Sequence, residues 1–270
     1  MFVSFNIEDF TAFSTDYFYK KGVDYYDGVA DIVEHSLEVY ISGNDSIDAA
    51  SLMHDWFPEV EADVFISHSH NDEKKAISLA GWLYENFGLK SFVDSCVWGY
   101  CNKLLKQIDI EYCDNGKPNS FSYESRNYST AHVHVMLMNA LTKMIDRCEV
   151  VFFINSKNAS YTLDEIKTYT LSPWIFNEIE ITRNIQMKYP QRPKTKCFSA
   201  DNLNEDVSDG LKVSYPLTLD HMIPLRSFWL NKWKNENGYI KGSFALDSLY
   251  EIKTREIKQL IRNHKKNCNL

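Results

Sequence analysis

The stretch ADVFISHSHNDEKKAISLAGWLYENFGLKSFVDS, residues 62–95, decides the fold. An apolar run within 63–67 predicts a β-strand, and the apolar residues from Ala76 to Phe87 then recur at helical spacing. Gly88 fits the end of that helix, and residues 91–94 predict a second strand. A strand, a helix and a second strand in this order predict a right-handed crossover between parallel strands.

A second apolar run, VVFFI at 150–154, predicts a strand buried on both faces, as in a parallel sheet. The predicted fold class is therefore α/β, with an open parallel sheet. We expect residues 1–60 to form a helical N-terminal extension, with helices over 25–41 and 47–56. Residues 61–235 are expected to form the α/β domain, with a polar insertion near 113–130. Residues 236–270 are expected to form a C-terminal helix packed on that domain.

Composition and charge restrict the class of function. The formal net charge of −8 and the pI near 5.5 argue against nucleic acid as a partner, because phosphate binding needs a basic face. No apolar run is long enough for a membrane span, and the N-terminus lacks the basic and apolar segments of a secretory signal. The six cysteines are scattered without a CxxC pair, so we expect reduced thiols and a cytoplasmic location.

The cysteines and histidines do not predict a metal site. The spacings C-x4-C and H-x-H differ from those of structural zinc sites, and an H-x-H pair on a helix points its two rings apart. No glycine-rich dinucleotide fingerprint, P-loop, HExxH or GxSxG motif occurs in the sequence. The residues considered as metal ligands and rejected are Cys96, Cys101, Cys113, His132 and His134.

Five motifs in a fixed order form a longer pattern. They are DVFISHS at 63–69, FVD at 92–94, WG at 98–99, VVFFINS at 150–156 and SPWIFNE at 172–178. In this order the chain resembles the TIR (Toll/interleukin-1 receptor) domain family over about residues 61–185, which implies a flavodoxin-like open parallel sheet. Two departures are visible. His70 takes the place of the family's basic residue, and the segment after Tyr112 is longer.

The resemblance implies that NAD is the substrate, and not a cofactor, because many bacterial and plant TIR domains cleave its nicotinamide–ribose bond. The family's catalytic Glu of the W-x-x-x-E motif maps onto Glu178. Trp174 lies one turn earlier on the same helix face and is expected to contact the substrate through its flat apolar ring. Nicotinamide leaves NAD as a neutral molecule, so one carboxylate that stabilises an oxocarbenium-like ribose suffices. The product is expected to be ADP-ribose or a cyclic or conjugated form. Such a signal would act on a downstream effector protein in bacterial anti-phage defence.

The expected substrate contacts lie at the ends of the first two strands. Ligands of open α/β sheets bind outside the carboxyl ends of the strands. We therefore expect Asp94 to bond a ribose hydroxyl or brace its loop, and Trp98 to stack on a base. In the alternative interpretation these residues have no part in binding or catalysis. The loop after the first strand then only caps the following helix, and Glu178 is an ordinary exposed helical residue. The loop residues expected to contact NAD are Ser67, His68, Ser69 and His70.

The loop over 95–103 corresponds to the BB loop of TIR domains and holds Trp98 and Tyr100. Aromatic residues are enriched at interface anchors, and the resemblance implies that this loop packs against a neighbouring TIR domain. Self-association is therefore expected, with a monomer as the alternative. Two other functions remain open: a non-catalytic TIR adaptor, and an enzyme resembling nucleoside deoxyribosyltransferases.

Overall fold

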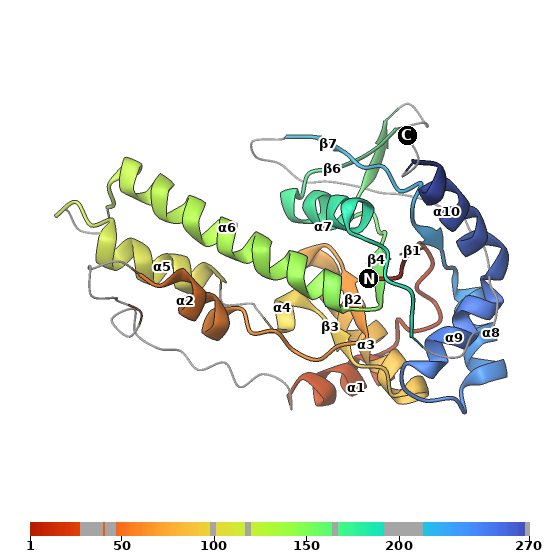
Figure 1. Ribbon diagram of the computed structural model, residues 1–270. Helices are drawn as coiled ribbons and strands as arrows, with labels where there is room; N and C mark the ends of the chain where they lie inside the picture. The colour runs from red at the N-terminus through yellow and green to blue at the C-terminus, as the bar shows by residue number, and fades with distance from the viewer. Residues whose placement is uncertain are drawn as a thin grey trace. The chain divides into compact units, whose positions relative to one another are not determined.

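The computed structural model describes residues 1–27, Tyr40, 47–97, 101–116, 120–163, 167–191 and 213–267. Contacts between residues divide the chain into two compact units. The first, the sheet unit, contains residues 1–27, 61–93 and 145–270. The second, the helical unit, contains residues 28–60 and 94–144, so the predicted single domain over 61–235 is interrupted. Figure 1 labels the elements of both units.

The sheet unit is built on a five-stranded, all-parallel sheet with the order β3-β2-β4-β1-β8. The predicted α/β fold with a flavodoxin-like open parallel sheet is confirmed. The neighbours β3, β2 and β4 reproduce the 2-1-3 order that begins this sheet type. The strands are β1 (Val3–Ile7), β2 (Val64–Ser67), β3 (Ser91–Phe92), β4 (Val150–Ile154) and β8 (Ile223–Pro224).

The N-terminal segment corrects the prediction of a helical extension over 1–60. Strand β1 lies inside the sheet, where Val3 pairs with Val150 of β4 and Phe5 pairs with Ile223 of β8. All five residues of β1 are buried. A strand this short has little periodicity of its own, and its partners come more than a hundred residues later in the chain. Of the predicted helices, 47–56 is confirmed as α2 (Ala49–Trp56), whereas 25–41 lies mostly outside the described residues.

Helices α1 (Asp16–Tyr26) and α3 (Glu73–Phe87) pack against each other with their backbones in contact. A Cβ atom added at Gly22 would lie 2.0 Å from the carbonyl oxygen of Ile77, and one at Gly81 would lie 2.1 Å from that of Phe18. Only glycine permits this approach. Gly88 ends α3 in the left-handed conformation with φ 65°, as predicted.

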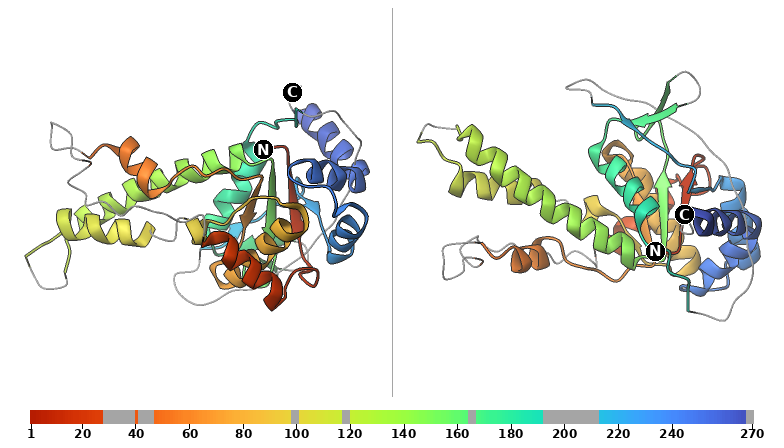
Figure 2. Two further views of the ribbon diagram at one scale, coloured as in Figure 1. Left: turned by 90° about the horizontal axis from the view of Figure 1, so that it is seen from below. Right: turned by 45° about the horizontal axis from the view of Figure 1, so that its top comes forward.

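The predicted single C-terminal helix over 236–270 is wrong in detail. The chain there contains the end of α8 (Ser227–Asn237), then α9 (Phe244–Ile252) and α10 (Thr254–Asn267). The three helices gather at one side of the sheet unit (Figure 2). The indole of Trp233 stacks on Phe87 at 3.9 Å and donates to the carbonyl of Ala245, which ties α8 to α3 and α9.

A small antiparallel sheet follows β4 and was not predicted. It consists of β5 (Tyr161–Leu163), β6 (Lys167–Thr170) and β7 (Tyr215–Pro216). Its last strand comes from the far side of a segment that lies outside the described residues. Helix α7 (Pro173–Asn184) begins directly after β6, and its Phe176 stacks on Tyr215 of β7 with ring centroids 4.9 Å apart.

The helical unit contains α2, α4 (Asp94–Val97), α5 (Cys101–Tyr112) and most of α6 (Tyr123–Arg147). Part of the polar stretch over 113–130 is helical, because α6 begins at Tyr123. Its polar side chains have a structural task, since Arg126 and Ser129 both bond the buried carboxylate of Asp109, at 2.7 and 2.9 Å. The predicted loop over 95–103 is helical at both ends, and residues 98–100 are not described. Across the described ranges, no helix has the length and apolar character to span a bilayer.

Candidate functional site

The carboxyl ends of β2 and β4 form the point of the sheet where strand order reverses. From β2 the chain proceeds outward to β3, and it later returns across β2 to β4. Connections that leave two adjacent strands in opposite directions open a crevice, and this is where ligands of such sheets bind. Ser67 is the last residue of β2, and Asn155 follows the last residue of β4.

Ser67 and Glu178 meet at this point. The hydroxyl of Ser67 donates a hydrogen bond of 2.6 Å to Oε2 of Glu178, although 111 residues separate them in the chain. Both are buried, with exposed fractions of 1% and 3%. Glu178 lies in the second turn of α7, a helix capped by Ser172 and begun by Pro173. A short bond from a hydroxyl to a buried carboxyl group fixes its position and partly replaces water.

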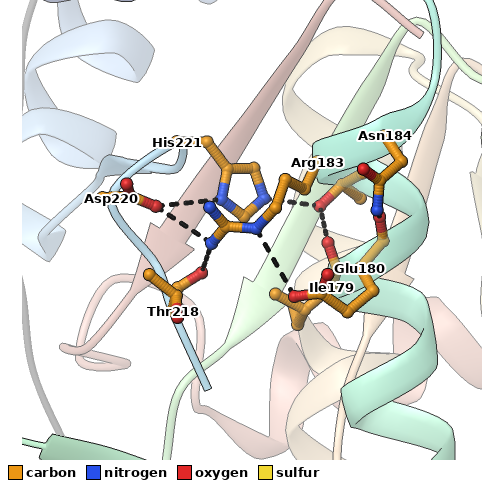
Figure 3. Close-up of polar contacts among 8 residues, drawn as sticks. Ile179, Glu180, Arg183, Asn184, Thr218, Asp220 and His221 are labelled. Carbon is orange, nitrogen blue, oxygen red and sulfur yellow. Dashed lines mark hydrogen bonds and ion pairs between the residues drawn. The ribbon is translucent and has the colours of Figure 1, made fainter. Parts of the chain in front are cut away.

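The far half of α7 is held by the loop before β8 (Figure 3). Thr182, four residues after Glu178, contacts Nε2 of His221 through its hydroxyl at 2.8 Å. Arg183 forms an ion pair of 2.9 Å with Asp220 and also bonds the carbonyl of Thr218. The His221 imidazole and the Arg183 guanidinium hold the pKa of the Asp220 carboxyl well below its ordinary value. Glu178 and Thr182 share one helix face, so this cluster helps to fix the face that carries Glu178.

The other residues predicted from the first-strand loop have different environments. His68 is buried, with Nδ1 3.4 Å from the carbonyl oxygen of Ile66. Ser69 is half-buried and precedes a short 3₁₀ turn, His70–Asp72. The side chain of His70 is exposed, with its nearest described carboxylate, that of Glu73, 4.0 Å away. Of this loop, Ser67 contacts Glu178 directly through its hydroxyl.

The remaining predicted residues are Trp174, Asp94 and Trp98. Trp174 is half-buried in the first turn of α7, one turn before Glu178. Asp94 begins α4 in the helical unit. Trp98 lies outside the described residues. Within the described ranges, no three histidine, cysteine or acidic side chains come close enough to hold a metal ion.

Asp72 is a site residue that the sequence interpretation missed. Its carboxylate is 1% exposed and accepts hydrogen bonds from Ser156, from Lys75 and, at 3.0 Å, from Asn158 Nδ2. It therefore ties the loop after β2 to the loop after β4. The available signal was an acidic residue directly after the Ser-His-Ser-His-Asn segment.

Two buried amides on neighbouring strands are incompletely satisfied. Oδ1 of Asn6, in β1, and Nδ2 of Asn155, after β4, have no hydrogen-bond partner among the described residues. Both side chains are at most 1% exposed. Buried polar atoms are nearly always paired, so unpaired ones often mark a functional site. Their presence at the carboxyl edge, together with Glu178, distinguishes this edge chemically.

The helical unit contains a cavity of about 950 Å³. It lies between α2, α5 and α6, and most of its lining is apolar, including Leu52, Ile108 and Met136. Its lining suits an apolar molecule better than a dinucleotide with a charged diphosphate.

Comparison of the chain with protein-family models, with curated proteins and with solved structures found no match.

Proposed function

We propose that this protein is an NAD-consuming enzyme of the TIR type that cleaves the bond between nicotinamide and ribose. The observation that supports the proposal is the contact between Ser67 and Glu178 at the point where strand order reverses. The two residues come from two different motifs of the TIR resemblance, the strand end FIS and the helix motif WxxxE. Their meeting in the ligand-binding region of the sheet is what that resemblance requires.

The chemistry needs one well-placed carboxylate. When the bond between C1′ and the nicotinamide nitrogen breaks, its electron pair goes to the nitrogen, and the cationic ring leaves as a neutral molecule. The positive charge that develops on the ribose is stabilised by the carboxylate of Glu178. Water or a hydroxyl group then attacks C1′ and loses its proton. The Ser67 hydroxyl orients the carboxylate throughout.

Burial sets a condition on this mechanism. At 3% exposure, Glu178 can reach a ribose only after neighbouring side chains move. Trp174 lies one helical turn away on the same face and is half-buried, so it is placed to move with substrate binding. We propose that the enzyme acts in the cytoplasm and that its ADP-ribose product, linear, cyclic or conjugated, signals to an effector protein in anti-phage defence.

The test is nicotinamide release from NAD by the purified protein and by Glu178→Gln. Glutamine keeps the shape and can still accept the Ser67 hydrogen bond, but it carries no charge. We expect release to fall about 100-fold, the usual loss of one electrostatic stabiliser, with little change in thermal stability. The matched control is Glu180→Gln, a partly exposed residue of the same helix that pairs with Arg183. If Glu180→Gln is inactive and Glu178→Gln is not, the assignment is wrong.

A related reaction is favoured by the same observation. A buried glutamate at the carboxyl edge of a flavodoxin-like sheet can also serve a nucleoside deoxyribosyltransferase-like enzyme, which breaks another N-glycosidic bond. Supplying nucleosides in place of NAD, with release of free base as the readout, separates the two reactions. A protein that is inactive on both, yet binds a second copy of itself, would fit the non-catalytic adaptor.

A further inference from the structure

The loop after β4 contains an exposed lysine on a firmly held backbone. Lys157 lies between Ser156 and Asn158, and both neighbours bond the buried carboxylate of Asp72 through their side chains. The amide of Asn158 also donates to the Ser156 hydroxyl at 2.9 Å, which closes the turn. The backbone of Lys157 is therefore held in place by its neighbours, while its side chain is exposed to solvent on the loop beside the end of β2.

Three carboxylates lie at the carboxyl edge around this loop. Glu178 and Asp72 are buried there, and Glu8 follows directly after β1. Asp72 and Glu8 each have a cationic partner, so a substrate diphosphate at this edge would need a further cation of its own. The need for a cation is sharper because the whole chain has a formal net charge of −8.

The cations at this edge differ in whether they pair with a carboxylate of the protein. Lys75 pairs with Asp72, and Arg226, which follows β8, lies 3.6 Å from Glu8. Lys157 forms no ion pair or hydrogen bond through its ammonium group with any residue that the structure describes. Of these three cations, Lys157 is the one whose charge is not offset by a carboxylate.

We propose that Lys157 binds the diphosphate of the dinucleotide substrate, an inference that rests on the proposed function. Ser67 lies opposite Phe153 in the sheet, and Lys157 comes four residues later. Strand spacing and the rise of four extended residues place its backbone at most about 15 Å from Ser67. A lysine side chain at that distance can reach a diphosphate while the ribose on the nicotinamide side contacts Glu178. Lysine binds phosphate as a point charge and tolerates this flexible geometry.

The experiment measures steady-state nicotinamide release for Lys157→Gln and Lys157→Arg. Losing one charge-assisted contact should raise KM for NAD about tenfold with little change in kcat, and Lys157→Arg should keep most of the affinity. The charge control is Lys188→Gln, because Lys188 pairs with Asp146 and bonds Met1 at the opposite, amino edge of the sheet. Lys157 is exposed, so we expect Lys157→Gln and Lys157→Arg to fold normally.

Binding of inorganic pyrophosphate, measured by calorimetry, gives a readout independent of turnover. Pyrophosphate should bind the unsubstituted protein and the Lys188→Gln control, and bind Lys157→Gln about tenfold more weakly. The subsite is disproved if Lys157→Gln leaves both KM for NAD and pyrophosphate binding unchanged. It is also disproved if Lys188→Gln raises KM and weakens pyrophosphate binding as much as Lys157→Gln does. Absence of nicotinamide release from the unsubstituted protein would instead refute the proposed function, while loss of pyrophosphate binding in Lys157→Gln would still support the anion site.

Discussion

A buried carboxyl group is costly unless hydrogen bonds replace its lost water. At Glu178 the hydroxyl of Ser67 contributes such a bond, at 2.6 Å. The sequence interpretation expected Ser67 to bind substrate directly, whereas its contact in the structure is with the catalytic candidate. In the proposed mechanism Ser67 is a positioning residue, because its hydroxyl holds the carboxylate of Glu178.

This role predicts how Ser67→Ala should behave. Loss of a hydrogen bond to a carboxylate should lower kcat for nicotinamide release about tenfold and change KM little, because the carboxylate is less well placed in the transition state. Ser69→Ala removes a half-buried hydroxyl from the same loop and is the matched control. Equal losses in both variants would show that the loop, and not the Ser67 hydroxyl, matters.

At the scale of the element, α7 connects the candidate site to the amino edge of the sheet. The hydroxyl of Thr182 donates to the carbonyl of Ile179 at 2.7 Å, and its oxygen lies 2.8 Å from Nε2 of His221. Nδ1 of the same ring lies 3.7 Å from Asp220, the carboxylate that also pairs with Arg183. Figure 3 shows Arg183 of α7 converging with Asp220 and His221 of the loop before β8.

The lowered pKa of Asp220 predicts the pH dependence of this anchor. A carboxyl group with a depressed folded-state pKa stabilises the fold fully above its unfolded value of about 3.8, and the effect is lost as pH falls toward the folded value. Asp220→Asn should therefore lower the melting temperature at neutral pH, and the difference should shrink progressively below pH 3.8. Thermal unfolding across this range tests it, with the exposed Asp24→Asn as control. A difference that is independent of pH would contradict the ionic role.

At the scale of the whole molecule, charge is unevenly distributed along the chain. Residues 1–63 contain fourteen acidic and two basic residues, whereas residues 251–270 contain six basic and two acidic residues. Opposite charge in these two parts of the sequence would favour a head-to-tail contact between copies, which need not close into a ring. The aromatic loop over 95–103 is the other feature that favours self-association.

Self-association predicts that nicotinamide release per molecule rises with protein concentration. Trp98→Ala should reduce both this rise and the particle mass measured by light scattering, because it removes an aromatic anchor. The control is Tyr239→Ala, an aromatic residue that is 80% exposed in the sheet unit. Added salt should lower the particle mass if charge contributes, since exposed ion pairs are screened. A constant specific activity with a monomeric mass would exclude assembly.

The sequence by itself determined the elements whose pattern is local. The apolar run of β4, the helical spacing and terminal glycine of α3, and the WxxxE spacing on α7 each depend on neighbours within a few residues. These patterns were enough to predict an open parallel α/β sheet, whereas Glu178 was selected through the resemblance to TIR domains. They also predicted a ligand edge at the end of β2.

Only the tertiary structure decided which residues far apart in the sequence contact each other. It placed β1 between β4 and β8, joined Ser67 to Glu178 over 111 residues, and used Asp72 to connect two loops. Parallel strands are paired through long crossovers, so a strand's partners leave no periodic trace in its own residues. The same holds for a buried polar side chain: its residue type shows that it needs a partner, but only the packed fold brings that partner within hydrogen-bonding distance.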